Sequence, residues 1–114
     1  MKNIKTYEGL FASKFDPMVK DIFEQIKTDI NENNKSAVYD KSYGRSCYRY
    51  YLKDNNLEIE AKDEVFYINY QLKLNGQEID CSSILKRKIY KFFDNQRKME
   101  EDRKSLDEIK KFNR

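Results

Sequence analysis

The 114-residue chain contains no histidine, and this absence removes many kinds of catalytic and metal site. Histidine is the commonest general base, belongs to the serine and cysteine triads, and completes the usual zinc sites. The two cysteines, Cys47 and Cys81, have neither the CxxC spacing of a metal site nor the density of a secreted disulfide scaffold. We therefore expect no metal, no cofactor and no catalytic residues.

Long apolar runs are absent as well. No stretch approaches the roughly 18 apolar residues that a membrane-spanning helix needs. The N-terminal sequence MKNIKTYEGLFASKF lacks the continuous apolar segment of a secretory signal. A phosphate-binding glycine loop is missing too, because Gly9, Gly44 and Gly76 are isolated from one another. These absences predict a soluble, cytoplasmic protein that does not bind membranes.

Charged residues are abundant, at 38% of the chain against 39% for hydrophobic residues. At this length we expect a single domain, residues 1–114, and so polar a composition predicts a small core or a solvated extension. The net charge of +3 is mild for a dedicated nucleic-acid binder. A composition rich in lysine, asparagine and aspartate suits an AT-rich genome, such as that of a phage or mobile element.

With one proline and three glycines, breaks in secondary structure are easy to locate. Asp16-Pro17 predicts a helix start, because Asp can cap the free amides and proline suits the first helical position. Apolar residues then recur at helical spacing: Val19, Ile22, Phe23, Ile26 and Ile30. We predict a helix over 17–32, preceded by apolar residues that pack on the core: Ile4, Tyr7, Leu10, Phe11 and Phe15.

From about residue 45 the apolar period changes from 3.6 to 2, which indicates strands. Three connectors, Asn55-Asn56, Asp63-Glu64 and Asn75-Gly76, are candidates for two-residue hairpin turns. Such turns pair apolar residues that all fall on one face: Leu52 with Ile59, Leu57 with Tyr70, and Leu72 with Ile79. The pattern predicts a four-stranded antiparallel meander with one buried side, toward which Tyr48 and Tyr50 point.

The last segment begins at Ser82-Ser83, which can cap a helix. An apolar stripe that would dock on the sheet follows it: Ile84, Leu85, Ile89, Phe92 and Phe93. We predict a helix over 83–111 with a projecting distal half, giving an α+β fold with both helices on one face of the sheet. The compact core spans about 4–93, and the charged extension, about 94–114, is expected to be dispensable for folding.

The leading functional hypothesis is a small non-catalytic interaction protein, a regulatory or inhibitory accessory factor that binds a macromolecular partner. On the outer sheet face, Arg49, Tyr51 and Tyr67 are the predicted contact residues, because tyrosine and guanidinium planes stack at little entropic cost. They could instead simply cover the sheet. On the last helix the candidates are Met99, Leu106 and Ile109. A weak homodimer through this helix stays open, although its 4-3 spacing is polar for a coiled coil.

The alternative hypothesis is a nucleic-acid-binding domain. Its cations come from two runs without acidic residues: Arg45, Arg49, Lys86, Arg87, Lys88 and Lys91. Over 17–93, the order of helix, sheet and second helix with basic residues near its start resembles that of double-stranded-RNA-binding domains, whose second helix contacts phosphates. This chain differs by a fourth strand and by the lack of a histidine. A solvated helix face would show the same cations, and only phosphate binding would weaken steeply with salt.

A remote alternative is a carboxylate-based enzyme. Glu58 and Glu60 share a strand face, as do Glu78 and Asp80, and these strands would lie roughly 9–10 Å apart. That spacing could suit paired catalytic carboxylates, although any charged sheet face shows it. Cys81 is expected in the core beside Tyr70. Cys47 could be exposed beside two arginines, which would lower the pKa of its thiol.

Overall fold

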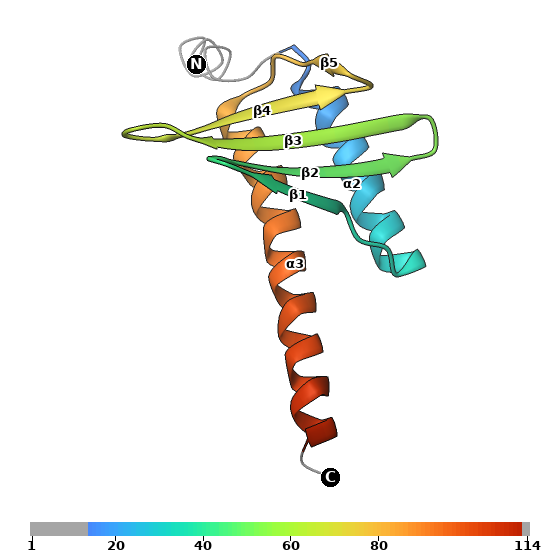
Figure 1. Cartoon of the computed structure of the whole chain (residues 1–114). Helices are drawn as coiled ribbons and strands as arrows, with labels where there is room; N and C mark the ends of the chain where they lie inside the picture. Colours follow the sequence, from blue (N-terminus) through green and yellow to red (C-terminus); the bar gives the residue numbers. More distant parts are fainter. Residues whose placement is uncertain (1–13, 113–114) are drawn as a thin grey trace, which may run out of the picture.

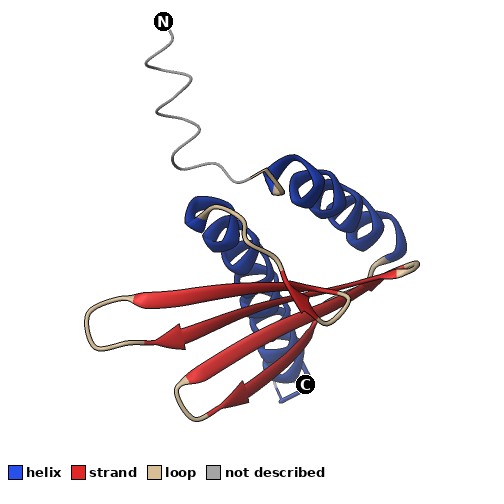
Figure 2. Cartoon of the chain, turned by 90° about the horizontal axis from the view of Figure 1, so that it is seen from above, coloured by secondary structure: helices blue, strands red, loops and turns tan. Residues whose placement is uncertain are grey.

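In the computed structural model the described residues are 14–112, with side chains described as far as Lys104. Two helices and five strands make up this part of the chain: α2 (Asp16–Asn33), β1 (Val38–Ser42), β2 (Arg45–Leu52), β3 (Asn55–Asp63), β4 (Ile68–Leu74), β5 (Gln77–Glu78) and α3 (Ser83–Phe112). The strands form one antiparallel sheet in chain order. Both helices lie on the same face of it, and α3 continues well past the sheet (Figures 1 and 2). The predicted α+β fold is confirmed.

The sheet has one strand more than predicted. β1 pairs with β2 across the turn at Tyr43-Gly44, where Gly44 adopts a φ of 72°. β1 was not predicted because it lies at the edge of the sheet, where only Tyr39 of its five residues is half-buried and the rest are exposed. An edge strand needs little apolar sequence, so its alternation of apolar and polar residues is weak.

The hairpin at Asn75-Gly76 has the predicted turn. Leu74 pairs with Gln77, both turn residues have positive φ, and the Ile79 N–H donates to the Leu72 carbonyl over 2.9 Å. Asparagine and glycine tolerate this left-handed backbone, which matches the twist of the flanking strands.

The other two hairpins have a different register. Ile59 pairs with Tyr48 instead of Leu52, and Leu57 pairs with Leu74 instead of Tyr70, a shift of four residues in each case. The first turn falls at Lys53-Asp54, where Lys53 has a φ of 53°, and Asn56 is a strand residue whose N–H donates to the side-chain oxygen of Asn75 over 2.8 Å. The second is a four-residue loop, 64–67. An even shift keeps every strand residue on its predicted face, which is why the buried side was predicted correctly.

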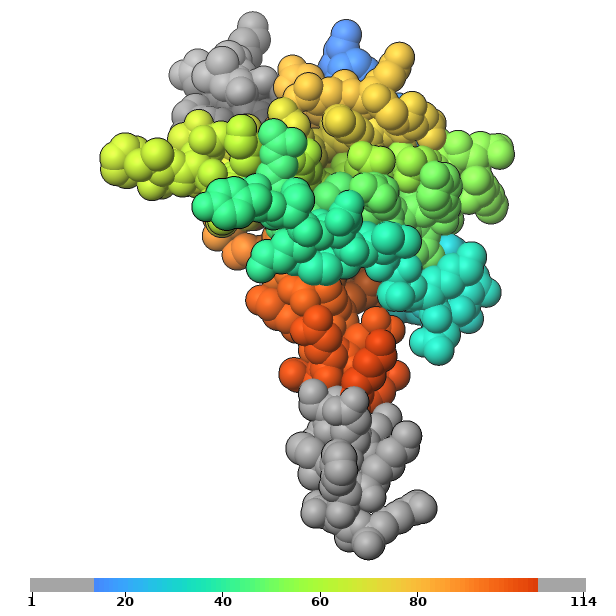
Figure 3. Space-filling view, in the orientation of Figure 1, coloured from blue at the N-terminus to red at the C-terminus, as the bar shows by residue number. Residues whose placement is uncertain are grey.

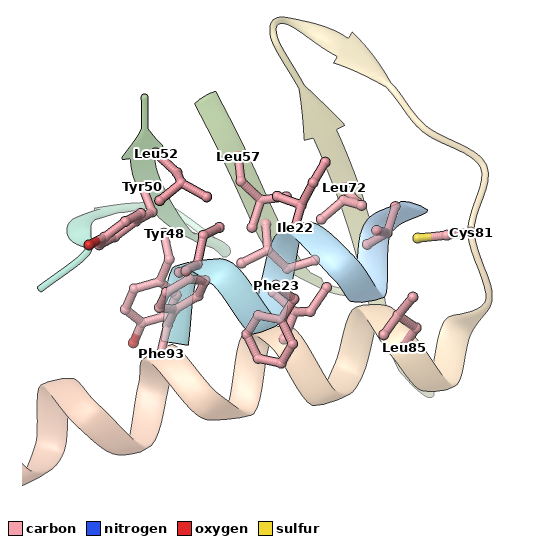
Figure 4. Packing of buried hydrophobic residues seen from close by; sticks show 14 of the residues in the cluster. Ile22, Phe23, Tyr48, Tyr50, Leu52, Leu57, Leu72, Cys81, Leu85 and Phe93 are labelled. Atoms are coloured by element: carbon pink, nitrogen blue, oxygen red, sulfur yellow. The ribbon is translucent and has the colours of Figure 1, made fainter. Parts of the chain in front are cut away.

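The core lies between the sheet and the two helices (Figure 4). Its buried hydrophobic residues come from every layer: Val19, Ile22, Phe23, Ile26, Ile30, Tyr48, Tyr50, Leu52, Leu57, Ile59, Leu72, Cys81, Leu85, Ile89 and Phe93. The Phe93 ring stacks on Tyr48 and Tyr50, with centroids 5.9 and 6.4 Å away. The prediction that these two tyrosines face the core is therefore confirmed.

The helix starts are joined by an unexpected contact. Asp16 does not cap α2, whose N-cap position is Phe15 without a side-chain cap. Its buried carboxylate instead accepts the Ser82 N–H over 2.9 Å, which ties the start of α2 to the segment before α3. Ser82 does cap α3, because its hydroxyl accepts the Leu85 N–H over 3.3 Å. The packing predicted for Ile4, Tyr7, Leu10 and Phe11 lies outside the described residues.

Neither of the helices in the described part of the chain combines the length and apolarity that crossing a bilayer requires.

Candidate interaction surfaces

The outer face of the sheet is a network of paired charges. The Arg49 guanidinium lies 3.3 Å from the Asp40 carboxylate and 3.5 Å from that of Glu58, and Arg45 lies 3.3 Å from Glu60. Because neighbouring strands supply opposite charges, this face presents little uncompensated charge to a ligand. The pairing also occupies Glu58 and Glu60, two of the carboxylates considered for catalysis.

The structure separates the three residues predicted to form a contact site on this face. Arg49 and Tyr51 do lie there, and Tyr51 is 69% exposed. The placement of Tyr67 on the sheet face was wrong, because it lies in the loop between β3 and β4. Tyr51 pairs with Asn56 at one end of β3, whereas the loop follows Asp63 at the other end. At about 3.3 Å per residue, the two tyrosines are roughly 20–25 Å apart along the strand.

The β3–β4 loop instead belongs to a cluster that we call the apolar end of the sheet: Tyr43, Val65, Phe66, Tyr67 and Ile68. Phe66 is 94% exposed and Val65 87% exposed, and the loop projects from the body of the molecule at the left of Figure 3. The loop is closed by a hydrogen bond from the Glu64 N–H to the Tyr67 carbonyl, 2.9 Å long.

Tyr43 joins this cluster through the backbone. The Asp63 N–H donates to the Gly44 carbonyl over 3.0 Å, so the β1–β2 turn lies beside the end of β3. Four consecutive apolar residues, 65–68, were the available sequence signal. A continuous apolar run of this kind is more typical of a buried strand than of a loop, so the sequence pattern alone did not reveal the loop.

A groove of about 380 Å³ lies beside the apolar end, lined by Ile68, Tyr70, Ser83, Ile84 and Arg87. Ile84 was predicted to dock on the sheet with the apolar stripe of α3, but it is 64% exposed and faces this groove. The adjacent Leu85 is the residue that enters the core. The groove therefore separates the first turn of α3 from β4.

The predicted basic surface is divided between the two sides of the sheet. Arg45 and Arg49 point to the outer face and are ion-paired, because strand alternation puts them opposite the core residues Tyr48 and Tyr50. The remaining cations are on α3, which covers the other face: Lys86, Arg87, Lys88 and Lys91. Among the described side chains, these four form no ion pair with an acidic residue.

On the projecting part of α3, Met99 is 66% exposed. It lines a groove of about 200 Å³ between α3 and the end of α2, to which Ile30 and Gln96 also contribute. Asp94 and Lys98, four residues apart on this helix, form an ion pair at 3.1 Å. The side chains of Leu106 and Ile109 lie outside the described residues.

A polar network fastens the middle of α3 to the sheet. The Tyr48 hydroxyl donates to Asp94 over 2.7 Å and accepts from Arg97 Nε over 2.9 Å. The Arg97 guanidinium also lies 4.2 Å from the centroid of the Tyr39 ring. Burial raises the pKa of Tyr48, and burial would also raise the pKa of Asp94, but hydrogen bonds from Tyr48 and Lys98 outweigh it and lower that pKa. The Tyr48 hydroxyl thus stays protonated and the Asp94 carboxyl stays ionised, as the hydrogen bond between them requires.

Neither cysteine has the lowered pKa that is typical of a reactive thiol. Burial raises the pKa of Cys81 to about 11. Burial, together with Glu58, also raises the pKa of Cys47 and outweighs the effect of Arg49, so the expected lowering was wrong. Within the described part of the chain, no three Cys, Asp or Glu side chains gather closely enough to hold a metal ion.

Comparison of the chain with protein-family models, with curated proteins and with solved structures finds no match.

Proposed function

We propose that this protein is a small non-catalytic accessory factor, of the regulatory or inhibitory kind, that binds another protein through the apolar end of its sheet. The observation that carries this proposal lies at the β3–β4 loop, which together with the first residue of β4 presents four consecutive large apolar residues, 65–68, to solvent. Contiguous exposed apolar side chains on a soluble domain are typical of interaction sites. Phenylalanine and tyrosine are also enriched at the centres of protein interfaces.

Phe66 is the best anchor in this cluster because it is 94% exposed and lies at the tip of the loop. Burying such a side chain in a partner contributes about 1.5–3 kcal/mol, which is roughly ten- to 150-fold in affinity. The outer face of the sheet is a weaker candidate. A partner there would have to remove water from the ion pairs of Arg45 and Arg49, and that cost offsets much of the gain.

Affinity capture of the tagged full-length chain from its host's lysate tests the proposal when it is run with and without nuclease. We expect a protein that stays bound after nuclease treatment and that Phe66→Ser loses. Val38→Ser is the matched control, because Val38 is an exposed apolar residue on β1, outside the cluster. Equal capture by both variants would contradict the proposal, and circular dichroism of each variant verifies that it is folded.

Nucleic-acid binding is the second candidate function, favoured by the cations at the start of α3, which have no acidic partner among the described side chains. For that function, replacing Lys86, Arg87 and Lys88 by glutamate should abolish binding, and the affinity of the unaltered chain should fall log-linearly with salt. Captured RNA or DNA, with every co-purifying protein lost on nuclease treatment, would replace the leading proposal by this one.

A further inference from the structure

One edge of the sheet is open beside the apolar end. β5 pairs with β4 only at Lys73 and Leu74, and the Ile79 N–H adds one bond to the Leu72 carbonyl. Main-chain groups of an antiparallel strand alternate between its two neighbours. Because the Leu72 carbonyl faces the β5 side, the N–H and carbonyl groups of Tyr70 and Ile68 face that side too. No strand among the described residues pairs with them there, so they are free to accept another strand.

The same two residues form one wall of the groove beside α3. Ile68 and Tyr70 face Ser83, Ile84 and Arg87 across a space of about 380 Å³. An extended segment paired with β4 would therefore direct every second side chain toward the helix and into this space. Ile68 and Ile84 are 48% and 64% exposed, so an apolar side chain between them would bury surface that is now in contact with water.

The positive charge of the groove favours an added strand that carries an acidic side chain. Arg87 lines it and has no acidic partner among the described side chains, and the exposed Lys88 follows Arg87 on α3. A carboxylate two positions from the apolar side chain would lie on the same side of an added strand, within reach of the guanidinium. The other open edge, β1, is less suited to an apolar segment, because it carries Asp40 and Lys41 and four of its five residues are exposed.

We infer that the open edge of β4 binds an extended, acidic segment of the partner protein as an added strand. An apolar side chain lies between Ile68 and Ile84, and an aspartate or glutamate two residues away pairs with Arg87. Main-chain hydrogen bonds supply affinity in this mode of recognition, and the pockets for alternate side chains supply specificity. The inference rests on the proposed function, because it names the kind of segment that the partner offers.

The test uses the full-length chain and a short synthetic peptide. Every second residue of the peptide is threonine, and the residues between the threonines are valine, glutamate and valine, in that order. With the peptide at about millimolar concentration, we expect slower hydrogen exchange at the amides of Ile68 and Tyr70 and no change along β1. A peptide with lysine in place of glutamate should bind about tenfold more weakly. Arg87→Glu should reverse this preference, whereas Arg103→Glu, the same charge change farther along α3, should leave it unaltered.

Three outcomes would overturn the inference. The first is that the amides of Ile68 and Tyr70 are already protected from hydrogen exchange without the peptide. The second is that the acidic and the lysine-containing peptides bind equally well. The third is that the peptide slows hydrogen exchange only along β1. If the acidic peptide has no effect while Phe66→Ser still loses its protein partner from lysate, strand addition fails and the proposed function stands. If the peptide binds as expected while Phe66→Ser retains the partner, the apolar end is not the docking site and the strand edge is.

Discussion

At the scale of single residues, the inward tyrosines are both core residues and anchors for the helices. The rings of Tyr48 and Tyr50 are buried, while their hydroxyls reach Asp94 on α3 and Asp29 on α2. Strand alternation predicts where the rings point. It cannot predict the carboxylates that they meet, because Asp94 is 46 residues from Tyr48 along the chain.

Removing the hydroxyl of Tyr48 should lower the stability of the fold. Tyr48→Phe keeps the ring but removes the hydrogen bonds to Asp94 and from Arg97, so we expect a loss of about 1–2 kcal/mol in the free energy of unfolding. Urea denaturation measures it. Tyr51→Phe is the matched control, since this ring is exposed on the outer face and should lose almost nothing. Equal stability of the two variants would mean that the network is not structural.

The lowered pKa values of Asp29 and Asp94 make the fold sensitive to acid. A carboxylate whose folded-state pKa lies below its unfolded value of 3.8 stabilises the fold while ionised. Its contribution is present above about pH 4 and is lost as the pH falls through the lower, folded value. The free energy of unfolding should therefore drop below about pH 4, and the drop should be smaller for Asp94→Asn than for the exposed Asp102→Asn. Unchanged acid sensitivity in Asp94→Asn would refute this assignment.

At the scale of elements, the turn at Asn75-Gly76 and the buried side of the sheet were predictable, whereas β1 and the register of two hairpins were not. Asn75-Gly76 specifies its own turn through two positive φ values. Asn55-Asn56 carries the same kind of signal, but Asn56 is used to bond Asn75 across the sheet. Long-range contacts of this sort decide between registers that differ by an even number of residues, since both bury the same faces.

The boundary of the core on α3 can be tested by truncation. The sequence suggested a cut after Phe93, but Asp94 and Arg97 contact Tyr48, and Arg97 covers Tyr39. We expect a chain ending at Lys104 to keep nearly full stability and a chain ending at Phe93 to lose about 2–4 kcal/mol, from these hydrogen bonds and the cation–π contact. Thermal unfolding of both chains measures the difference. Equal melting temperatures would place the boundary at Phe93 after all.

At the scale of the whole molecule, the sheet has two faces and one distinctive end. Helices cover one face and ion pairs neutralise charges on the other. The most exposed apolar side chains, Tyr43, Val65 and Phe66, lie at the end where the β3–β4 loop projects, and Figure 3 shows this projection. Composition and periodicity predicted the layers of this fold. The apolar end escaped prediction because Asp63-Glu64 imitates a two-residue turn, which placed Val65 and Tyr67 on a strand.

Site-specific photocrosslinking tests the central claim most directly. The photoreactive residue p-benzoylphenylalanine replaces Phe66, Tyr51 or Met99, one for each candidate surface, and the chains are irradiated in nuclease-treated host lysate. We predict a discrete protein adduct from position 66 and none from position 51. An adduct from position 51 or 99 without one from position 66 would contradict binding through the apolar end of the sheet.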